Sequence, residues 1–141
     1  MLQAGLAAGD QLGRIQWRAA DKYSEWAMDV MATGRKADAT TGFQKALSAA
    51  PDHPGANFNM GVILAAEGKH GSAVVHYRKV VKAMPDFAGA HFNLAQSLAT
   101  LEKFHESAKH FQRAAVLQPE NKLARTRLHQ VLRQGKGSPQ R

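Results

Sequence analysis

Residues 54–87, PGANFNMGVILAAEGKHGSAVVHYRKVVKAMPDF, align without a gap with residues 88–121, AGAHFNLAQSLATLEKFHESAKHFQRAAVLQPEN. The two stretches share the motif Gly-Ala-x-Phe-Asn near their starts. Pro51, Pro85 and Pro119 recur with the same spacing, each after a stretch of helical character. Proline ends a helix because it lacks the N–H donor and crowds the preceding turn. The chain is therefore built on a repeat whose period is the spacing of these prolines.

Large and small residues also recur at fixed columns of this repeat. A large residue precedes a small one near each start: Trp26-Ala27, Met60-Gly61 and Leu94-Ala95. A second small residue is followed four places later by an aromatic one: Phe43, Tyr77 and Phe111. Apolar residues at helical intervals form a stripe, and the small residues allow a second helix to approach closely. The columns predict helices over 21–33, 37–50, 55–67, 71–84, 89–101, 105–118 and 122–134.

This pattern resembles the tetratricopeptide repeat, a helix pair with a period of about 34 residues. The resemblance covers 20–53, 54–87 and 88–121, and residues 122–134 repeat the opening helix alone, as a capping helix. It implies an all-α fold, a right-handed superhelical α-solenoid of antiparallel helix pairs. Because each pair leaves apolar surface bare, the repeats stabilise one another by stacking.

The turns inside the repeats are expected to differ. Gly34 and Gly68 occupy the position between the two helices, where a positive φ costs glycine least. The third repeat has Glu102 there. Its turn should therefore be less typical or slightly strained.

The two ends of the chain are less patterned. Residues 1–19, with Gly5, Gly9 and Gly13 spaced four apart, allow three interpretations. They form a helix that caps the front of the stack, a frayed leader, or a glycine-faced helix that packs on a partner. The tail 135–141 is predicted to be disordered.

Charge is concentrated at the C-terminal end. The chain carries a formal net charge of +8 and a pI near 10.1, yet residues 122–141 hold six Lys and Arg and no acid. An acidic partner is therefore expected at that end, through Arg125, Arg127, Arg133 and Lys136. Nucleic acid is a weaker candidate, because the end of the chain contains no aromatic side chain for base stacking.

Catalytic motifs are lacking in the sequence. It contains no cysteine, no glycine-rich phosphate loop and no Gly-x-Ser-x-Gly. None of the seven histidines has another at i+4, the spacing that a helical metal site prefers. His76 and His110 occupy equivalent columns, typical of surface or interface positions. We therefore expect no enzyme activity, no cofactor and no metal site.

The family resemblance implies a concave groove, lined by the first helix of every repeat, that holds a peptide. The corresponding positions are acidic at the front, apolar and amide in the middle, and basic at the back. The main candidates are Glu25, Met28, Phe58, Asn59, Phe92, Asn93, Gln96 and Arg127. Further groove positions are Asp21, Ser24, Met31, Val62, Ala65, Thr100, Thr126, Gln130 and Arg133.

Asn59 and Asn93 are the sharpest feature of this groove. A carboxamide can pair with both the N–H and the C=O of a peptide backbone, and the pair resembles the asparagine ladder of O-linked N-acetylglucosamine transferases. Two alternatives stay open: the asparagines bond neighbouring helices, and Phe58 and Phe92 form inter-repeat contacts. The clamp by which chaperone adaptors hold a C-terminal carboxylate is matched only at Asn59, so such a partner is not expected.

These observations favour a protein–protein interaction module or scaffold that binds a peptide segment of a partner. The competing hypotheses are a basic C-terminal end that binds an acidic surface or nucleic acid, and a repeat region excised from a larger transferase. No apolar run is long enough to span a membrane. A native start at Met1 favours the cytoplasm, and a different start leaves the periplasm open. End-to-end stacking into a homo-oligomer is a further expectation.

Overall fold

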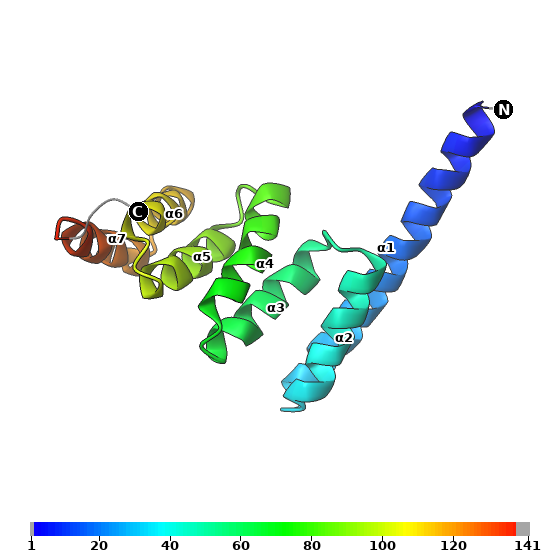
Figure 1. The fold of residues 1–141 in the computed structure, drawn as a ribbon, viewed down its shortest axis with the longest axis horizontal. Coiled ribbons are helices and arrows are strands. Elements are labelled where there is room, and N and C mark those ends of the chain that lie inside the picture. The colour runs from blue at the N-terminus through cyan, green and yellow to red at the C-terminus, as the bar shows by residue number, and fades with distance from the viewer. Residues whose placement is uncertain (1, 138–141) are drawn as a thin grey trace. The chain divides into compact units, whose positions relative to one another are not determined.

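We analysed a computed structural model, which describes residues 2–137 and the side chains of residues 9–137. The described residues form seven α-helices and no strand, so the fold is an all-α helical repeat (Figure 1). The helices are α1 (Leu2–Ala32), α2 (Lys36–Ala49), α3 (Pro54–Ala66), α4 (His70–Ala83), α5 (Ala88–Thr100), α6 (Phe104–Leu117) and α7 (Lys122–Gly135).

The chain divides into two compact units, residues 1–59 and residues 60–141, which we call unit one and unit two. The boundary falls inside α3. In unit one α1 packs on α2, and in unit two α5 packs on both α4 and α6, while α6 packs on α7.

The predicted helices from α2 to α6 differ from the observed ones by a single residue at each end, because the proline and glycine columns mark the turns. The prediction for the first helix was wrong about its start. We expected a helix over 21–33, but α1 runs without a break from Leu2. Residues 14–22 contain neither proline nor glycine. Alanine and arginine in that stretch favour continuation of the helix.

Small residues allow the close helix contacts, as expected. In unit two a Cβ added to Gly61 would lie 2.5 Å from the ring of Tyr77, so only glycine fits against this aromatic side chain. Tyr77 is itself buried, as are Leu94, Leu98 and Phe111. In unit one Phe43 and Ala27 are buried in the same way. The aromatic and small columns therefore form the core of each unit, whereas Trp26, the large residue of the first repeat, is 46% exposed.

The turn between the helices of each repeat contains the residue with positive φ. Gly34 has φ 82° and Gly68 has φ 77°, and Glu102 has φ 60° at the corresponding position of the third repeat. The prediction of an atypical turn at Glu102 is confirmed. A side chain in this region costs roughly 1–2 kcal/mol relative to glycine.

Side chains at one further column of the repeat form hydrogen bonds to the turns that contain the prolines. The sequence does not single out this column. The Nδ2 of Asn57 donates to the carbonyl oxygen of Pro51 at 2.9 Å, in unit one. In unit two the Nε2 of His91 donates to Pro85 O at 2.7 Å, and an Nη of Arg125 donates to Pro119 O at 2.9 Å. Three different side chains thus satisfy the equivalent backbone carbonyl in successive repeats.

Candidate functional site

A cavity of about 590 Å³ opens on unit two. Its lining comes from α3, α4, α5, α6 and α7. The lining residues are Val62, Ala65, His70, Tyr77, Asn93, Gln96, Ser97, Ala99, Thr100, Phe111, Arg127, Gln130, Val131 and Gln134. This volume lies in the range of sites that bind ligands. We call it the unit-two cavity.

Four carboxamides contribute to the polar side of the cavity, together with His70, Tyr77, Ser97, Thr100 and Arg127. Asn93 and Gln96 stand on α5, and Gln130 and Gln134 stand on α7. Among the described residues that form the lining, Arg127 is the only arginine or lysine, and none is an aspartate or glutamate. An Nη of Arg127 donates to Oε1 of Gln130 at 3.1 Å, which orients the guanidinium. The cavity therefore offers neutral hydrogen-bonding groups and one fixed positive charge.

Tyr77 contributes a buried hydroxyl to the cavity lining. Burial raises the pKa of Tyr77 to about 12, and a hydrogen bond from the Asn93 side chain opposes that rise. The phenol is therefore neutral at physiological pH. Because Asn93 already bonds Tyr77, it offers a ligand only its remaining hydrogen-bonding capacity.

Several groove positions carried over from the family meet at this cavity. They are Val62, Ala65, Asn93, Gln96, Thr100, Arg127 and Gln130. Phe92 is not in the lining. Its ring meets Phe111 edge to face, with centroids 5.4 Å apart, and it packs against the buried cluster that includes Val131. Phe92 therefore contributes to helix packing, and its contact with Phe111 lies within the third repeat and is not an inter-repeat contact.

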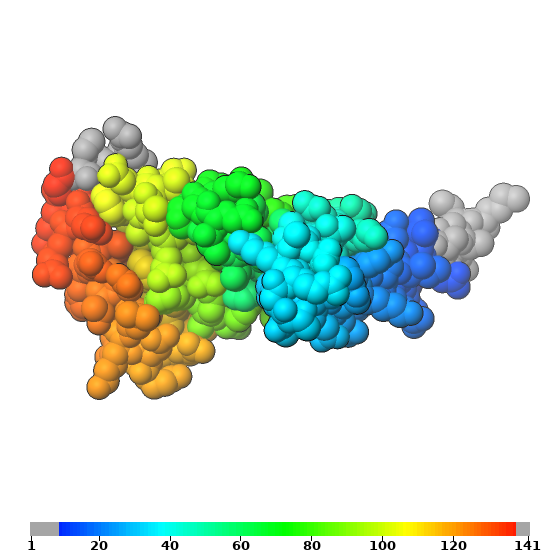
Figure 2. Space-filling view, turned by 90° about the horizontal axis from the view of Figure 1, so that it is seen from below, coloured from blue at the N-terminus to red at the C-terminus, as the bar shows by residue number. Residues whose placement is uncertain are grey.

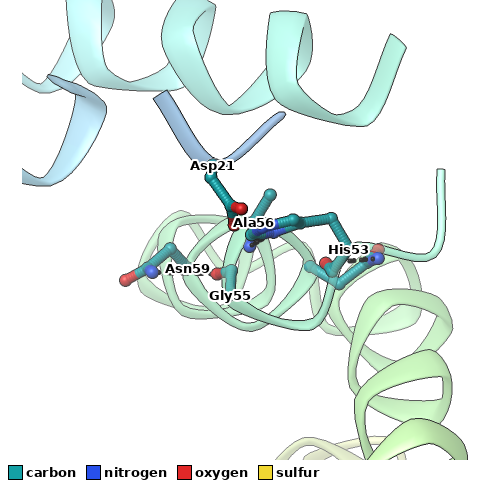
Figure 3. A network of polar contacts seen from close by, with 6 residues as sticks. Asp21, His53, Gly55, Ala56 and Asn59 are labelled. Atoms are coloured by element: carbon teal, nitrogen blue, oxygen red, sulfur yellow. Dashed lines mark hydrogen bonds and ion pairs between the residues drawn. The ribbon is translucent and has the colours of Figure 1, made fainter. Parts of the chain in front are cut away.

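The remaining main groove candidates belong to unit one, while the further positions Thr126 and Arg133 lie on α7 outside the cavity lining. Glu25 and Met28 are exposed on α1, and Phe58 and Asn59 are half-buried on α3. The Nδ2 of Asn59 donates to the carbonyl oxygen of Gly55 at 2.9 Å, one turn earlier in the same helix (Figure 3). The two asparagines thus each have an internal partner, and their role as a peptide ladder stays a prediction.

Sequence reasoning missed a polar network at the start of α3 (Figure 3). His53 is buried, and its Nδ1 accepts a hydrogen bond from the N–H of Ala56 at 3.0 Å. Its Nε2 therefore carries the proton and donates to Oδ1 of Asp21 at 2.8 Å. The imidazole caps the first turn of α3 and ties it to α1. Both ring nitrogens are occupied, so this aspartate–histidine pair is structural and is not a general base.

A second missed contact joins two histidines in unit two. His110 was aligned with His76, but its ring stacks on His91, and their Nδ1 atoms are 3.0 Å apart. Because His91 Nε2 donates to Pro85, its Nδ1 is the acceptor and His110 Nδ1 is the donor. Burial lowers the pKa of His110, nearby His91 lowers it further, and Glu106 opposes the change. Within the described residues no cluster of three or more metal-ligating side chains exists.

The basic end of the chain is exposed along α7. Arg125, Arg127 and Arg133 are all exposed, and Lys136 follows the helix. In the part of the chain that the structure describes, these side chains form no ion pair with a carboxylate: Arg125 bonds a backbone carbonyl and Arg127 an amide. The tail was predicted to begin at Gly135, but Gly135 is the last residue of α7 and residues 136–137 form a turn, while residues 138–141 fall outside the described part of the chain.

The sequence matches two family models, both described as tetratricopeptide repeat, over residues 24–86 and residues 88–121. These matches follow the three repeats found from the proline spacing. The chain belongs to the tetratricopeptide repeat family. No curated protein matches the chain.

Solved structures of other tetratricopeptide repeats share this fold. The first repeat domain of Spaghetti (RPAP3), bound to an HSP90 peptide SRMEEVD, is 20% identical with a TM-score of 0.76, over 86% of this chain and 96% of that one. The C-terminal tetratricopeptide-repeat domain of a Plasmodium falciparum FK506-binding protein is 16% identical, with a TM-score of 0.75, over 89% and 93%. A mutant Thermobaculum terrenum O-GlcNAc transferase is 21% identical, with a TM-score of 0.71, over 83% of this chain but only 22% of that one.

Tetratricopeptide repeats generally mediate protein–protein interactions, and their domains are typically non-catalytic scaffolds. Among the described helices, none has the length and apolar character needed to cross a bilayer.

Proposed function

We propose that this tetratricopeptide repeat protein binds an extended, acidic segment of a partner protein in the unit-two cavity. The observation that carries the proposal is the lining as the described residues form it: carboxamides from α5 and α7 converge on one space with a single arginine and no acid. The unit-two cavity includes several of the positions at which the family resemblance implies a groove. It has a volume of about 590 Å³ and carries the positive charge of Arg127.

The carboxamides suit a peptide backbone. Gln96 and Gln130 are exposed, and each side-chain amide can donate and accept a hydrogen bond. An extended partner segment has backbone N–H and C=O groups without internal partners, and these groups can pair with the two amides. Each such bond contributes roughly 0.5–1.5 kcal/mol net, so a pair contributes about tenfold to a hundredfold in affinity. Val62 and Ala65 add an apolar wall that favours a non-polar side chain of the segment.

Arg127 supports the preference for an acidic segment. Its guanidinium is held by Gln130 and can form a two-pronged contact with a carboxylate. Arg125 and Arg133 on the same helix raise the positive potential near the cavity without lining it. An Asp or Glu of the partner is therefore expected at the α7 side.

The peptide complex of the Spaghetti (RPAP3) domain supports this mode of binding, although an identity of 20% carries over the fold alone. The positions of the chaperone-tail clamp are Ser24, Met28, Asn59, Gly89 and Asn93 in this chain, and only Asn59 matches that clamp. We therefore propose an internal acidic segment and not a clamped C-terminal carboxylate.

A displayed library of random peptides, selected on the purified chain, tests the proposal. Selected peptides are expected to contain an acidic residue, and Gln96→Ala together with Gln130→Ala should weaken their binding at least tenfold. The matched control is Gln112→Ala, an exposed glutamine of α6 outside the cavity. Equal binding by the cavity variant and the control would show that peptides bind elsewhere.

The competing function is charge-driven binding of an acidic surface or nucleic acid by the whole basic end. It is favoured by the exposed arginines of α7, which bond a carbonyl and an amide. It predicts that an RNA oligonucleotide binds with an affinity that falls steeply with salt and is lost when Arg125, Arg127 and Arg133 become glutamine. If a peptide binds in the unit-two cavity, its affinity should instead depend on Arg127 much more than on Arg125.

A further inference from the structure

The first helix of the chain exposes residues whose equivalents elsewhere are buried. Tyr23 and Trp26 of α1 are 41% and 46% exposed, whereas His91 and Leu94, two repeats later in the same columns, are 7% and 0% exposed. In unit two α5 packs against both α4 and α6, and His91 stacks on His110 of α6. In unit one the packing partner of α1 is α2, whose Lys45 and Gly42 lie beside the rings of Tyr23 and Trp26 and leave both rings more than two-fifths exposed.

The uncovered face continues toward the N-terminus. Leu12 and Ile15 are 56% and 63% exposed. The N-terminal part of α1 extends beyond α2 (Figures 1 and 2). Leu12, Ile15, Ala19, Tyr23 and Trp26 follow the spacing of one helix face, at steps of three, four, four and three positions. We call these residues the α1 stripe.

The α1 stripe has the same spacing read in either direction from Ala19. We infer that two copies of this chain pair through α1 in an antiparallel dimer centred on Ala19. In that register Leu12 of one copy lies opposite Trp26 of the other, and Ile15 lies opposite Tyr23. The small Ala19 meets its own equivalent at the two-fold axis, where a small side chain permits the closest approach. Such a contact is isologous and closes on itself.

Charge favours the antiparallel arrangement. Residues 10–18 carry Arg14 and Arg18 against Asp10, and residues 21–29 carry Asp21, Glu25 and Asp29 against Lys22. Antiparallel pairing therefore brings a basic half beside an acidic half, with Arg14 near Glu25 of the second copy. A parallel pair would place each arginine beside its own equivalent. Opposite charges along the flanks set orientation in helix pairs in this way.

A second copy is thus a better occupant of this face than the end-to-end contact expected from the sequence. A head-to-tail contact between ends joins two different surfaces and generates a ring or an open chain. The α1 stripe is complementary to itself in both shape and charge. Because it lies on α1 and the unit-two cavity lies on other helices, dimerisation leaves the proposed peptide site unchanged in composition.

Molar mass in solution is the first test. Light scattering across a range of protein concentrations should give twice the 15.3 kDa of the single chain at high concentration. Leu12→Glu combined with Ile15→Glu should restore the single-chain mass, with unchanged helicity because both residues are exposed. The matched control is Val75→Glu with Val116→Glu, two exposed valines of α4 and α6, which should remain dimeric.

Single cysteines test the register, since the chain has none of its own. Under mild oxidation Ala19→Cys should form a disulfide-linked dimer. Leu12→Cys alone should not, because antiparallel pairing separates the two sites by about 21 Å, three times the reach of a disulfide. A mixture of Leu12→Cys and Trp26→Cys should cross-link.

Three results would overturn the dimer. The first is a single-chain mass at every concentration, which would leave the α1 stripe to another protein. The second is a dimer that survives the double glutamate variant. The third is efficient self-linking of Leu12→Cys, which would indicate a parallel pair. None of these results bears on peptide binding, so the two proposals fail independently.

Discussion

The helices α1 and α5 occupy the same place in their repeats, yet they have different surroundings. His91 and Leu94 of α5 are buried, while Tyr23 and Trp26 at the same positions of α1 are exposed. In unit two α5 packs on both α4 and α6, whereas in unit one α1 packs on α2. The helices also end in different turns, at Gly34 and at Glu102. The same columns therefore form part of the core in unit two and an exposed face in unit one.

The largest loss of stability is expected from truncating the large residue that α5 and α1 carry at the same column, Leu94 and Trp26. Leu94 is fully buried, so Leu94→Ala should lower the free energy of unfolding by about 3 kcal/mol, measured by urea denaturation. Trp26→Ala should cost about half as much, because its ring is 46% exposed and rests on Gly42.

Protein concentration sharpens this prediction. If α1 mediates dimerisation, the loss from Trp26→Ala should grow with concentration, whereas the loss from Leu94→Ala should not. Equal losses from both substitutions at low concentration would contradict the assignment of Trp26 to an open face.

A smaller effect is expected at the turns after the two helices. Glu102→Gly should stabilise the protein by about 1 kcal/mol, because glycine adopts φ 60° without the steric cost of a side chain. The reverse change, Gly34→Glu, should destabilise it by a similar amount. A Cβ at Gly34 meets no atom within 4 Å, so this variant reports the backbone cost alone. No change at either site would show that the turns carry no strain.

The smallest effect is expected from the histidine pair of α5 and α6, and it appears as a pH dependence. The pKa of His110 is lowered in the fold from its ordinary value of 6.5, chiefly by burial. The unfolded chain therefore binds more protons near that value, so this stability is present above pH 6.5 and is lost as the pH falls.

Urea unfolding at a series of pH values checks this sign. His110→Gln should reduce the loss of stability on acidification, while the exposed His105→Gln should leave it unchanged. The pKa of His76 is also lowered, by burial and by Lys79, so some pH dependence should persist in the His110 variant. A His110→Gln protein with the full wild-type dependence would contradict the assignment.

The repeat architecture could be predicted because its signals are periodic. Prolines, glycines and the large–small columns recur with one period, and each has a local physical cause. The unusual turn at Glu102 could be predicted because the first two repeats have glycine at this position and the third does not. The continuous helix through residues 14–22 was missed because the repeat pattern ends there, and helix continuation depends on the absence of a breaker.

The polar contacts were harder to predict because they depend on packing between helices. Asn57, His91 and Arg125 look unrelated as residue types, although each bonds the carbonyl of a proline six positions earlier. His110 meets His91, and not a residue of its own column. The cavity positions of Asn93, Gln96 and Arg127 could be carried over from the family. Tyr77, a member of the aromatic column, was not foreseen as a cavity residue.

The most direct test of peptide binding compares two arginines on one helix. Fluorescence anisotropy would measure binding of one library-selected acidic peptide to the wild type, to Arg127→Gln and to Arg125→Gln at constant salt. Both variants lose one positive charge from α7, but only Arg127 lines the unit-two cavity. We predict that Arg127→Gln weakens binding about tenfold or more and that Arg125→Gln changes it less than about threefold. Equal losses from the two variants would contradict the account, because they would indicate attraction to the basic helix as a whole.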